Sequence, residues 1–213
     1  DNGKVITVAA SETPHAEILE EAKKILEQEG WNLQVTVFDD YVLPNNVVES
    51  GEFDANYIQH IPYLESFNKE NGTHIVSAGG IHYEPFGIYG GTKHDLKEIA
   101  RGDTIAVPND TTNEARALLL LQDQGILKLK EGAGLEATVN DITENPYEIK
   151  FHELEAAQIA RVKEETSYIV LNGNYALAAG FSVSQDALAQ ETSESEAAKT
   201  YVNIIGVKEG NED

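Results

Sequence analysis

Short apolar runs alternate with amphipathic stretches along the N-terminal part of the chain. Residues 4–10 (KVITVAA) form a β-branched apolar run, which is typical of a buried parallel strand. In residues 15–28 the apolar positions recur at helical spacing, which predicts an amphipathic helix stopped by Gly30. Residues 33–38 then alternate between apolar and polar positions, as strands do. This order of strand, helix and strand predicts a β-α-β crossover in a parallel sheet.

The alternation of strands and helices continues towards the C-terminal end. We expect further strands at residues 55–57, 73–77, 104–107, 149–153, 168–171 and 201–207, and further helices at residues 42–49, 61–71, 96–100, 112–124, 156–163 and 175–179. Residues 79–91 are rich in glycine and aromatic residues, and we interpret them as a crossing between two lobes. The sequence therefore predicts two α/β lobes, residues 1–88 with 182–213 and residues 89–181. A ligand would bind between the lobes, at the ends of the strands.

The composition excludes several classes of function. The chain of 213 residues carries 15 basic and 37 acidic side chains, a formal net charge of −22, which repels nucleic acids and anionic lipid surfaces. No apolar run approaches the roughly 20 residues that a membrane helix needs. The chain has no cysteine, which excludes disulfides and thiolate metal sites. Residues 190–199 are polar and of low complexity, and we expect a solvated loop and helix face there.

The sequence gives little support for catalysis. It contains no nucleophile elbow, no zinc-protease motif and no phosphate-binding loop. His82 and Glu84 lie two residues apart, so on a strand they would share one face and could hold a metal ion. We favour a hydrogen-bonded pair over a metal site, because no third ligand lies near them in the sequence. We therefore predict neither an enzyme nor a bound metal.

A polar segment between a strand and a helix is a better candidate for binding. Residues 108–116 (PNDTTNEAR) follow a predicted strand and open a predicted helix. A helix start presents unpaired N–H groups and suits an anion such as a carboxylate. Arg116 lies one turn beyond Asn113, and a guanidinium can bind a carboxylate through two hydrogen bonds. The alternative is a capped helix whose arginine is solvated or paired with a nearby acid, and this segment alone favours neither.

Aromatic and amide side chains gather near other predicted strand ends. Tyr41, Tyr57, His60 and Tyr63 lie close together in the sequence. Such residues are usually ordinary core, but His60 and Tyr63 lie one turn apart at a helix start, where a crevice would open. Residues 172–175 (NGNY) follow a strand and form either a plain turn or a donor of amide contacts to an amino acid.

Seven segments match a known family of binding proteins, nearly end to end and in the same order. They are residues 13–19 (TPHAEIL), 40–45 (DYVLPN), 54–64 (DANYIQHIPYL), 106–110 (AVPND), 112–121 (TNEARALLLL), 153–158 (ELEAAQ) and 171–176 (LNGNYA). With these segments the chain resembles the methionine-binding lipoproteins of the NlpA/MetQ type, the substrate-binding components of ABC importers. The resemblance implies a two-lobe periplasmic-binding-protein fold of type II that closes on L-methionine.

The resemblance also implies a role for each residue of a ligand site. The thioether of the ligand would lie in an aromatic slot, its carboxylate on a guanidinium and its amino-acid backbone against an amide. At the matching positions stand Tyr41, Tyr57, His60 and Tyr63 for the slot, Arg116 for the carboxylate, Asn172 for the backbone, and Asn113 and Glu84 as neighbours. No cofactor and no catalytic residue are implied.

The implied partners are an ABC permease with its ATPase. The family also implies a lipid-modified cysteine upstream of Asp1, which would tether the protein at the outer face of the cytoplasmic membrane. Three alternatives remain open from the sequence. The same fold could bind a methionine-containing dipeptide or another apolar amino acid. The chain could instead be a metal-assisted enzyme using His82 and Glu84, or a surface adhesin without a small ligand.

Overall fold

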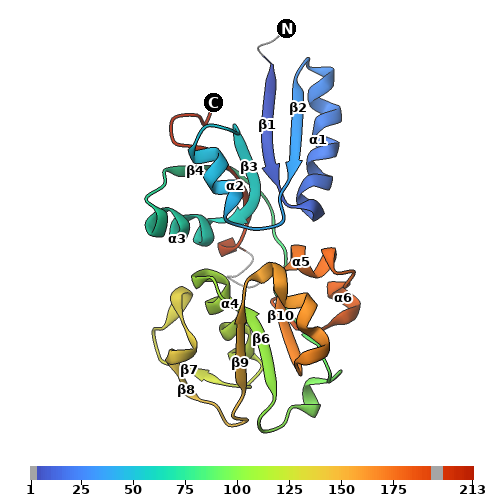
Figure 1. Cartoon of the computed structure of the whole chain (residues 1–213), viewed down its shortest axis with the longest axis vertical. Helices are drawn as coiled ribbons and strands as arrows, with labels where there is room; N and C mark the ends of the chain where they lie inside the picture. The colour runs from blue at the N-terminus through green and yellow to red at the C-terminus, as the bar shows by residue number, and fades with distance from the viewer. Residues whose placement is uncertain (1–3, 193–198) are drawn as a thin grey trace. The chain divides into compact units, whose positions relative to one another are not determined.

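The computed structural model describes residues 4–192 and 199–213, and the chain divides into two compact units (Figure 1). Unit 1 runs to Tyr83 and resumes at Lys199, and unit 2 begins at Glu84. The sequence placed these boundaries at residues 88/89 and 181/182. The difference arises because β5 (Gly87–Gly90) and β11 (Ala187–Gln190) pair with each other, so both strands belong to the sheet of unit 2.

Unit 1 is built on a five-stranded sheet with the order β2-β1-β3-β12-β4. Its strands are β1 (Val5–Ala10), β2 (Asn32–Val37), β3 (Ala55–His60), β4 (Ile75–His82) and β12 (Asn203–Lys208), and its helices are α1 (Glu17–Gln28), α2 (Leu43–Glu49) and α3 (Ile61–Asn71), with an irregular turn, η1 (Glu12–Ala16), before α1. Strand β1 pairs in parallel with β2 and β3, which confirms the predicted crossover. Strand β12 lies antiparallel between β3 and β4.

The apolar face of α1 packs on one side of this sheet. Leu19 of α1 is buried in a cluster with Val8 of β1 and Tyr57 of β3. Ala22, three residues after Leu19, and Leu26, four residues further on, lie on the same side of the helix and pack against the same cluster. Val48 of α2 packs in a separate buried cluster with β4 and β12. The helical spacing of apolar positions in the sequence therefore marks the buried face of α1 correctly.

Unit 2 has its own five-stranded sheet, with the order β11-β5-β10-β6-β9. Its other strands are β6 (Thr104–Pro108), β9 (Lys150–Leu154) and β10 (Tyr168–Leu171), with a separate ladder of β7 (Lys128–Leu129) and β8 (Ile142–Glu144). Its helices are α4 (Thr111–Asp123), α5 (Gly173–Ala178) and α6 (Val183–Asp186), with the 3₁₀ segments η2 (Leu96–Glu98), η3 (Gly134–Glu136), η4 (Val139–Asp141) and η5 (Ala156–Glu165). Strand β10 runs parallel to β6 and antiparallel to β5.

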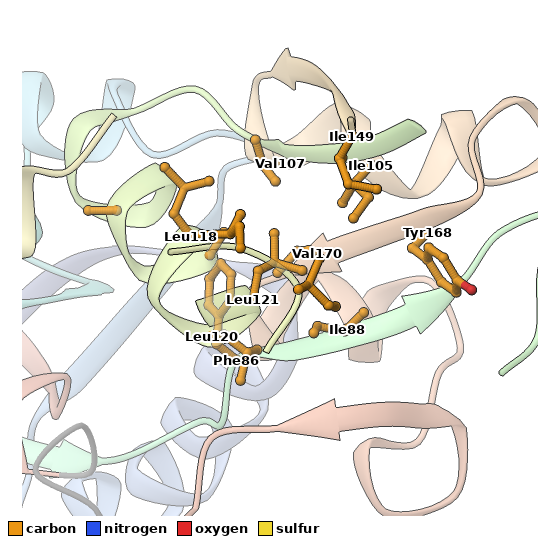
Figure 2. Packing of buried hydrophobic residues seen from close by; sticks show 14 of the residues in the cluster. Phe86, Ile88, Ile105, Val107, Leu118, Leu120, Leu121, Ile149, Tyr168 and Val170 are labelled. Atoms are coloured by element: carbon orange, nitrogen blue, oxygen red, sulfur yellow. The ribbon is translucent and has the colours of Figure 1, made fainter. Parts of the chain in front are cut away.

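The largest buried cluster of unit 2 surrounds α4. Leu118 and Leu121 of this helix are fully buried and belong to one cluster with Ile105 of β6 and Val170 of β10. Figure 2 shows the leucines of α4 lying over these strands, with Phe86, which directly precedes β5, in the same cluster. Because almost the whole surface of α4 is covered, its N-terminal turn is held firmly in place.

Most predicted elements are present, but some differ in kind or extent. The helices expected at residues 96–100 and 156–163 are 3₁₀ segments. The predicted crossing at residues 79–91 begins inside β4 and ends beyond β5, so only the middle of it connects the two units. Within residues 4–192 and 199–213, no helix is both long enough and apolar enough to cross a membrane.

Candidate functional site

The guanidinium of Arg116 lies buried in unit 2, on the second turn of α4. The helix begins at an Asp110 cap, whose carboxylate accepts a hydrogen bond from the backbone N–H of Asn113 (3.0 Å). Only 4% of the Arg116 side chain is exposed. A buried cation needs a partner, since desolvation of an isolated charge is expensive. The structure therefore identifies Arg116 as the central charged group of this region.

Glu191 is the carboxylate that pairs with Arg116. Arg116 Nε donates to Glu191 Oε2 (2.9 Å), and Nη2 donates to Oε1 (2.6 Å). Nη2 also donates to the backbone carbonyl of Glu84 (3.0 Å), and the guanidinium lies 4.8 Å from the ring centre of Phe86. Of the two alternatives that the sequence left open, the structure thus shows an arginine paired with an acid, although this acid lies 75 residues away.

The expectation of a solvated loop at residues 190–199 is wrong for Glu191. Its side chain is 9% exposed, and its carboxylate also accepts a hydrogen bond from the backbone N–H of Phe86 (2.9 Å). The polar composition around it concealed one buried residue, because only the tertiary partner distinguishes Glu191 from its neighbours. Residues 193–198 of the same stretch lie outside the described residues.

Asn172 places a buried amide at the start of α5. It precedes the helix in an extended conformation, but its side chain makes no capping hydrogen bond. Its Oδ1 atom is buried and has no hydrogen-bond partner in the part of the chain that the structure describes. An unpaired buried acceptor is uncommon, because leaving it unsatisfied costs about 1–3 kcal/mol. The position of Asn172 is therefore one where a donor from a ligand would be stabilising.

Of the other two predicted residues of unit 2, Glu84 lies in the loop before β5 and Asn113 lies on α4 with Arg116. The main chain at Glu84 contacts Arg116, and its side chain lies against Gly173, where an added Cβ would come within 2.7 Å of Glu84 Cβ. The absence of a side chain at Gly173 thus allows the start of α5 to approach Glu84. Asn113 is 1% exposed and lies one turn before Arg116 on α4. Glu84 therefore connects the elements that carry Arg116 and Asn172.

Three of the four predicted aromatic residues meet in unit 1. The ring centres of Tyr41 and Tyr63 lie 5.6 Å apart, and the Tyr63 hydroxyl donates to the Tyr41 carbonyl (3.0 Å). His60 caps α3 by accepting the backbone N–H of Tyr63 at Nδ1 (3.1 Å). The edge of Tyr201 meets the His60 ring at 4.9 Å. Tyr201 was missed, because only the pairing of β12 with β3 brings it to His60.

Tyr57 belongs to a different cluster of unit 1. Its ring lies 4.7 Å from His15, and its hydroxyl is hydrogen-bonded to Nδ1 of His82. His15 in turn pairs through Nε2 with Asn203 Oδ1 (2.8 Å). Tyr57 and His60 are three residues apart on β3, and residues at odd spacing on a strand point to opposite faces. Strand alternation alone could therefore have separated Tyr57 from the other three.

A second buried acid lies on α4 beside Arg116. Burial first, and then a hydrogen bond and like charge from Glu153, raise the pKa of Glu114 to about 7, while the Val139 N–H opposes the shift. Glu114 is therefore largely protonated below neutral pH. A carboxyl pair of this kind can hold a proton.

The sequence of the whole chain decides the family. Residues 6–213 match the family model described as NlpA lipoprotein. The chain belongs to the NlpA lipoprotein family. It is 39% identical over 214 residues to the methionine-binding lipoprotein MetQ of Bacillus subtilis, covering 99% of this chain and 77% of the relative. The predicted family is thereby confirmed.

Solved structures agree with this assignment. The NlpA-family chain superposes with a TM-score of 0.92 on a nutrient-binding protein of Burkholderia cenocepacia bound to methionine, at 45% identity, covering 98% of this chain and 86% of the other. A protein of Ruminococcus gnavus ATCC 29149 is 75% identical, with a TM-score of 0.98 and coverage of 99% and 87%. The predicted α/β fold with two lobes is confirmed.

Proposed function

We propose that this chain binds methionine and delivers it to the permease of an ABC importer, and that it does not catalyse a reaction. The family assignment and the methionine-bound relative support this proposal. The observation that carries it is the buried Asn172 Oδ1, which has no hydrogen-bond partner among residues 4–192 and 199–213, in the same unit as the buried Arg116. A zwitterionic amino acid needs an acceptor for its ammonium group and a cation for its carboxylate, and these two residues supply one of each.

In this proposal two residues of unit 2 hold the polar ends of the ligand. Asn172 accepts the ammonium group and Arg116 receives the carboxylate, with Glu84 and Asn113 as neighbours. Arg116 serves Glu191 and the ligand together, because a guanidinium has five N–H groups and can bind more than one acceptor.

The apolar part of the ligand distinguishes methionine from other amino acids. Tyr41, His60 and Tyr63 present aromatic surfaces that suit a polarizable thioether. A sulfur atom against a ring edge contributes about 0.3–1.5 kcal/mol, which a chain of the same length without sulfur would lose in part. Selectivity for the side chain would therefore rest on the aromatic residues, and recognition of the amino-acid backbone on Asn172 and Arg116.

The cellular setting follows from the same family. We propose that a lipid anchor holds the chain at the outer face of the cytoplasmic membrane, where an importer receives its substrate. The net charge of −22 would keep the folded chain away from anionic lipids, so a covalent anchor and not surface attraction would hold it there. Its partners would then be the ABC permease and the associated ATPase.

Calorimetric titration with a defined ligand series tests the proposal. The series contains L-methionine, D-methionine, L-leucine, glycyl-methionine and L-methioninol, which lacks the carboxylate. We expect L-methionine to bind, and methioninol to bind more weakly by on the order of 2–5 kcal/mol if a buried guanidinium receives the carboxylate. Tighter binding of glycyl-methionine would move the substrate to peptides. Absence of binding by every member of the series would contradict the proposed function.

Substitutions of Arg116 measure its contribution to methionine affinity, and a substitution of an exposed arginine serves as the control. Arg116→Ala should weaken methionine by on the order of 2–5 kcal/mol, or about 30- to 5000-fold in affinity. Because this change also leaves Glu191 buried without its partner, Arg116→Lys serves as the second variant, which keeps the charge but not the two-bond geometry. Arg161→Ala removes an exposed arginine of the same unit and should leave the affinity unchanged. Full affinity in Arg116→Lys would contradict the role of Arg116.

A further inference from the structure

Glu191 makes more contacts than charge compensation of Arg116 requires. Its carboxylate accepts hydrogen bonds from Arg116 Nε and Nη2 and from the backbone N–H of Phe86. Its own backbone N–H donates to the carbonyl of Phe86 (3.0 Å). The preceding strand β11 pairs with β5 through Gln190 and Gly87. The Glu191 carboxylate is therefore fixed by its main chain as well as by its side chain.

These contacts also fix the plane of the guanidinium. An arginine side chain has several rotatable bonds, and ordering it on binding costs conformational entropy. Here Glu191 occupies the Nε–Nη2 edge, the Glu84 carbonyl accepts from Nη2, and the Phe86 ring lies beside the planar group. Three contacts in different directions leave the guanidinium one orientation before any ligand arrives.

We propose that Glu191 is the positioning residue for Arg116, which orients the guanidinium to receive the carboxylate of the ligand. This inference rests on the proposed function and deepens it, because it assigns a role to a residue outside the seven segments on which the sequence resemblance was based. Glu191 and the ligand carboxylate bind the same cation without exchanging places. If Glu191 competed with the ligand, its carboxylate would have to leave Arg116 when the ligand binds. The hydrogen bonds between Glu191 and the main chain of Phe86 instead keep the carboxylate beside Arg116.

Replacing Glu191 by the neutral residue of the same shape, Gln, distinguishes its effect on the orientation of Arg116 from the effect of its negative charge on the ligand. Glu191→Gln removes a negative charge near the ligand carboxylate, so charge alone predicts tighter binding of methionine. It also places an amide N–H₂ where one carboxylate oxygen accepts from Arg116 now, and two donors cannot pair. The positioning role therefore predicts weaker binding, which is the opposite sign.

The test titrates wild type, Glu191→Gln, Glu191→Asp and a control, Glu131→Gln, with L-methionine and L-methioninol. Glu131 is an exposed acid of the same unit. We expect Glu191→Gln to lose at least about tenfold in affinity for methionine and less than about twofold for methioninol. Glu191→Asp keeps the carboxylate and should lose less than Gln. The thermal midpoint of each variant shows whether it is folded, and the Asp variant maintains the test if Gln unfolds.

The outcomes separate this inference from the proposed function. Equal or tighter binding of methionine by Glu191→Gln would overturn the positioning role, and so would equal losses for both ligands, which would indicate a purely structural role. In both cases wild type would still bind methionine, and the proposed function would stand. If wild type binds neither ligand, the proposed function fails, and the role of Glu191 fails with it.

Discussion

Replacement of Glu114 by Gln should change the pH dependence of stability in a defined direction. The carboxyl of Glu114 is 6% exposed on α4, and burial raises its pKa to about 7, with Glu153 as the next cause and Asp110 as a further one. Gln keeps the size of the side chain and its capacity to hydrogen-bond with Glu153, but it cannot ionise. The substitution therefore removes the titration and little else.

The sign follows from the protons bound in each state. An unfolded Glu114 ionises near its ordinary pKa of 4.5, whereas the folded chain keeps the proton up to about pH 7. Between these values the folded state binds more protons, so wild-type stability falls as pH rises, and the loss is complete above about pH 7. The difference of the two pKa values corresponds to a penalty on the order of 3 kcal/mol. Glu114→Gln should escape that penalty.

Urea unfolding followed by far-ultraviolet circular dichroism measures this difference. At about pH 8 we expect Glu114→Gln to be more stable than wild type by on the order of 1–3 kcal/mol, and near pH 4.5 we expect the two to be equal within about 0.5 kcal/mol. Glu136→Gln, which removes an exposed carboxyl of unit 2, should show no such trend. A difference that stays constant from pH 4.5 to pH 8, or that favours wild type at pH 8, would refute the reasoning.

Two further substitutions test the packing of each unit. Leu118→Ala empties a fully buried position and should lower the free energy of unfolding by about 2–5 kcal/mol, whereas Leu135→Ala, at a side chain that is 44% exposed, should change it little. In unit 1, Asn45 Oδ1 accepts from the amides of Asn56 and Gln59. Asn45→Ala leaves both donors buried and should cost about 2–4 kcal/mol in a denaturant titration, and a loss below 1 kcal/mol would show that the network relaxes.

The start of the fold could be predicted because its signals are local. The β-branched run of β1 and the helical spacing of α1 lie within single elements, and their parallel pairing follows from the order of the elements. Strands β5 and β11 were missed, because β5 carries glycine at both ends and β11 is short and rich in alanine. Only their partners across the sheet make them strands.

The candidate site divides in the same way. Arg116 could be selected because the helix start that carries it is visible in one short segment. Glu191 could not, since its burial depends on a partner 75 residues away and its neighbours are polar. Tyr57 is a third case, because it lies three residues before His60 on β3. Successive side chains of a strand point to opposite faces, so the sequence alone places these two on opposite faces. The pattern of residues along the sequence therefore predicts which helices and strands carry a site. It predicts less well which side chains come together in that site.

The position of β12 has a consequence for the order of folding during synthesis. Strand β12 lies between β3 and β4, yet it is made after all of unit 2. Until it emerges, β3 and β4 each present an unpaired edge, and unpaired edges invite association with other chains. Unit 2 is continuous in sequence and can fold first. A nascent chain therefore carries an incomplete N-terminal sheet until β12 is translated, and its unpaired strand edges stay open to other chains during that interval.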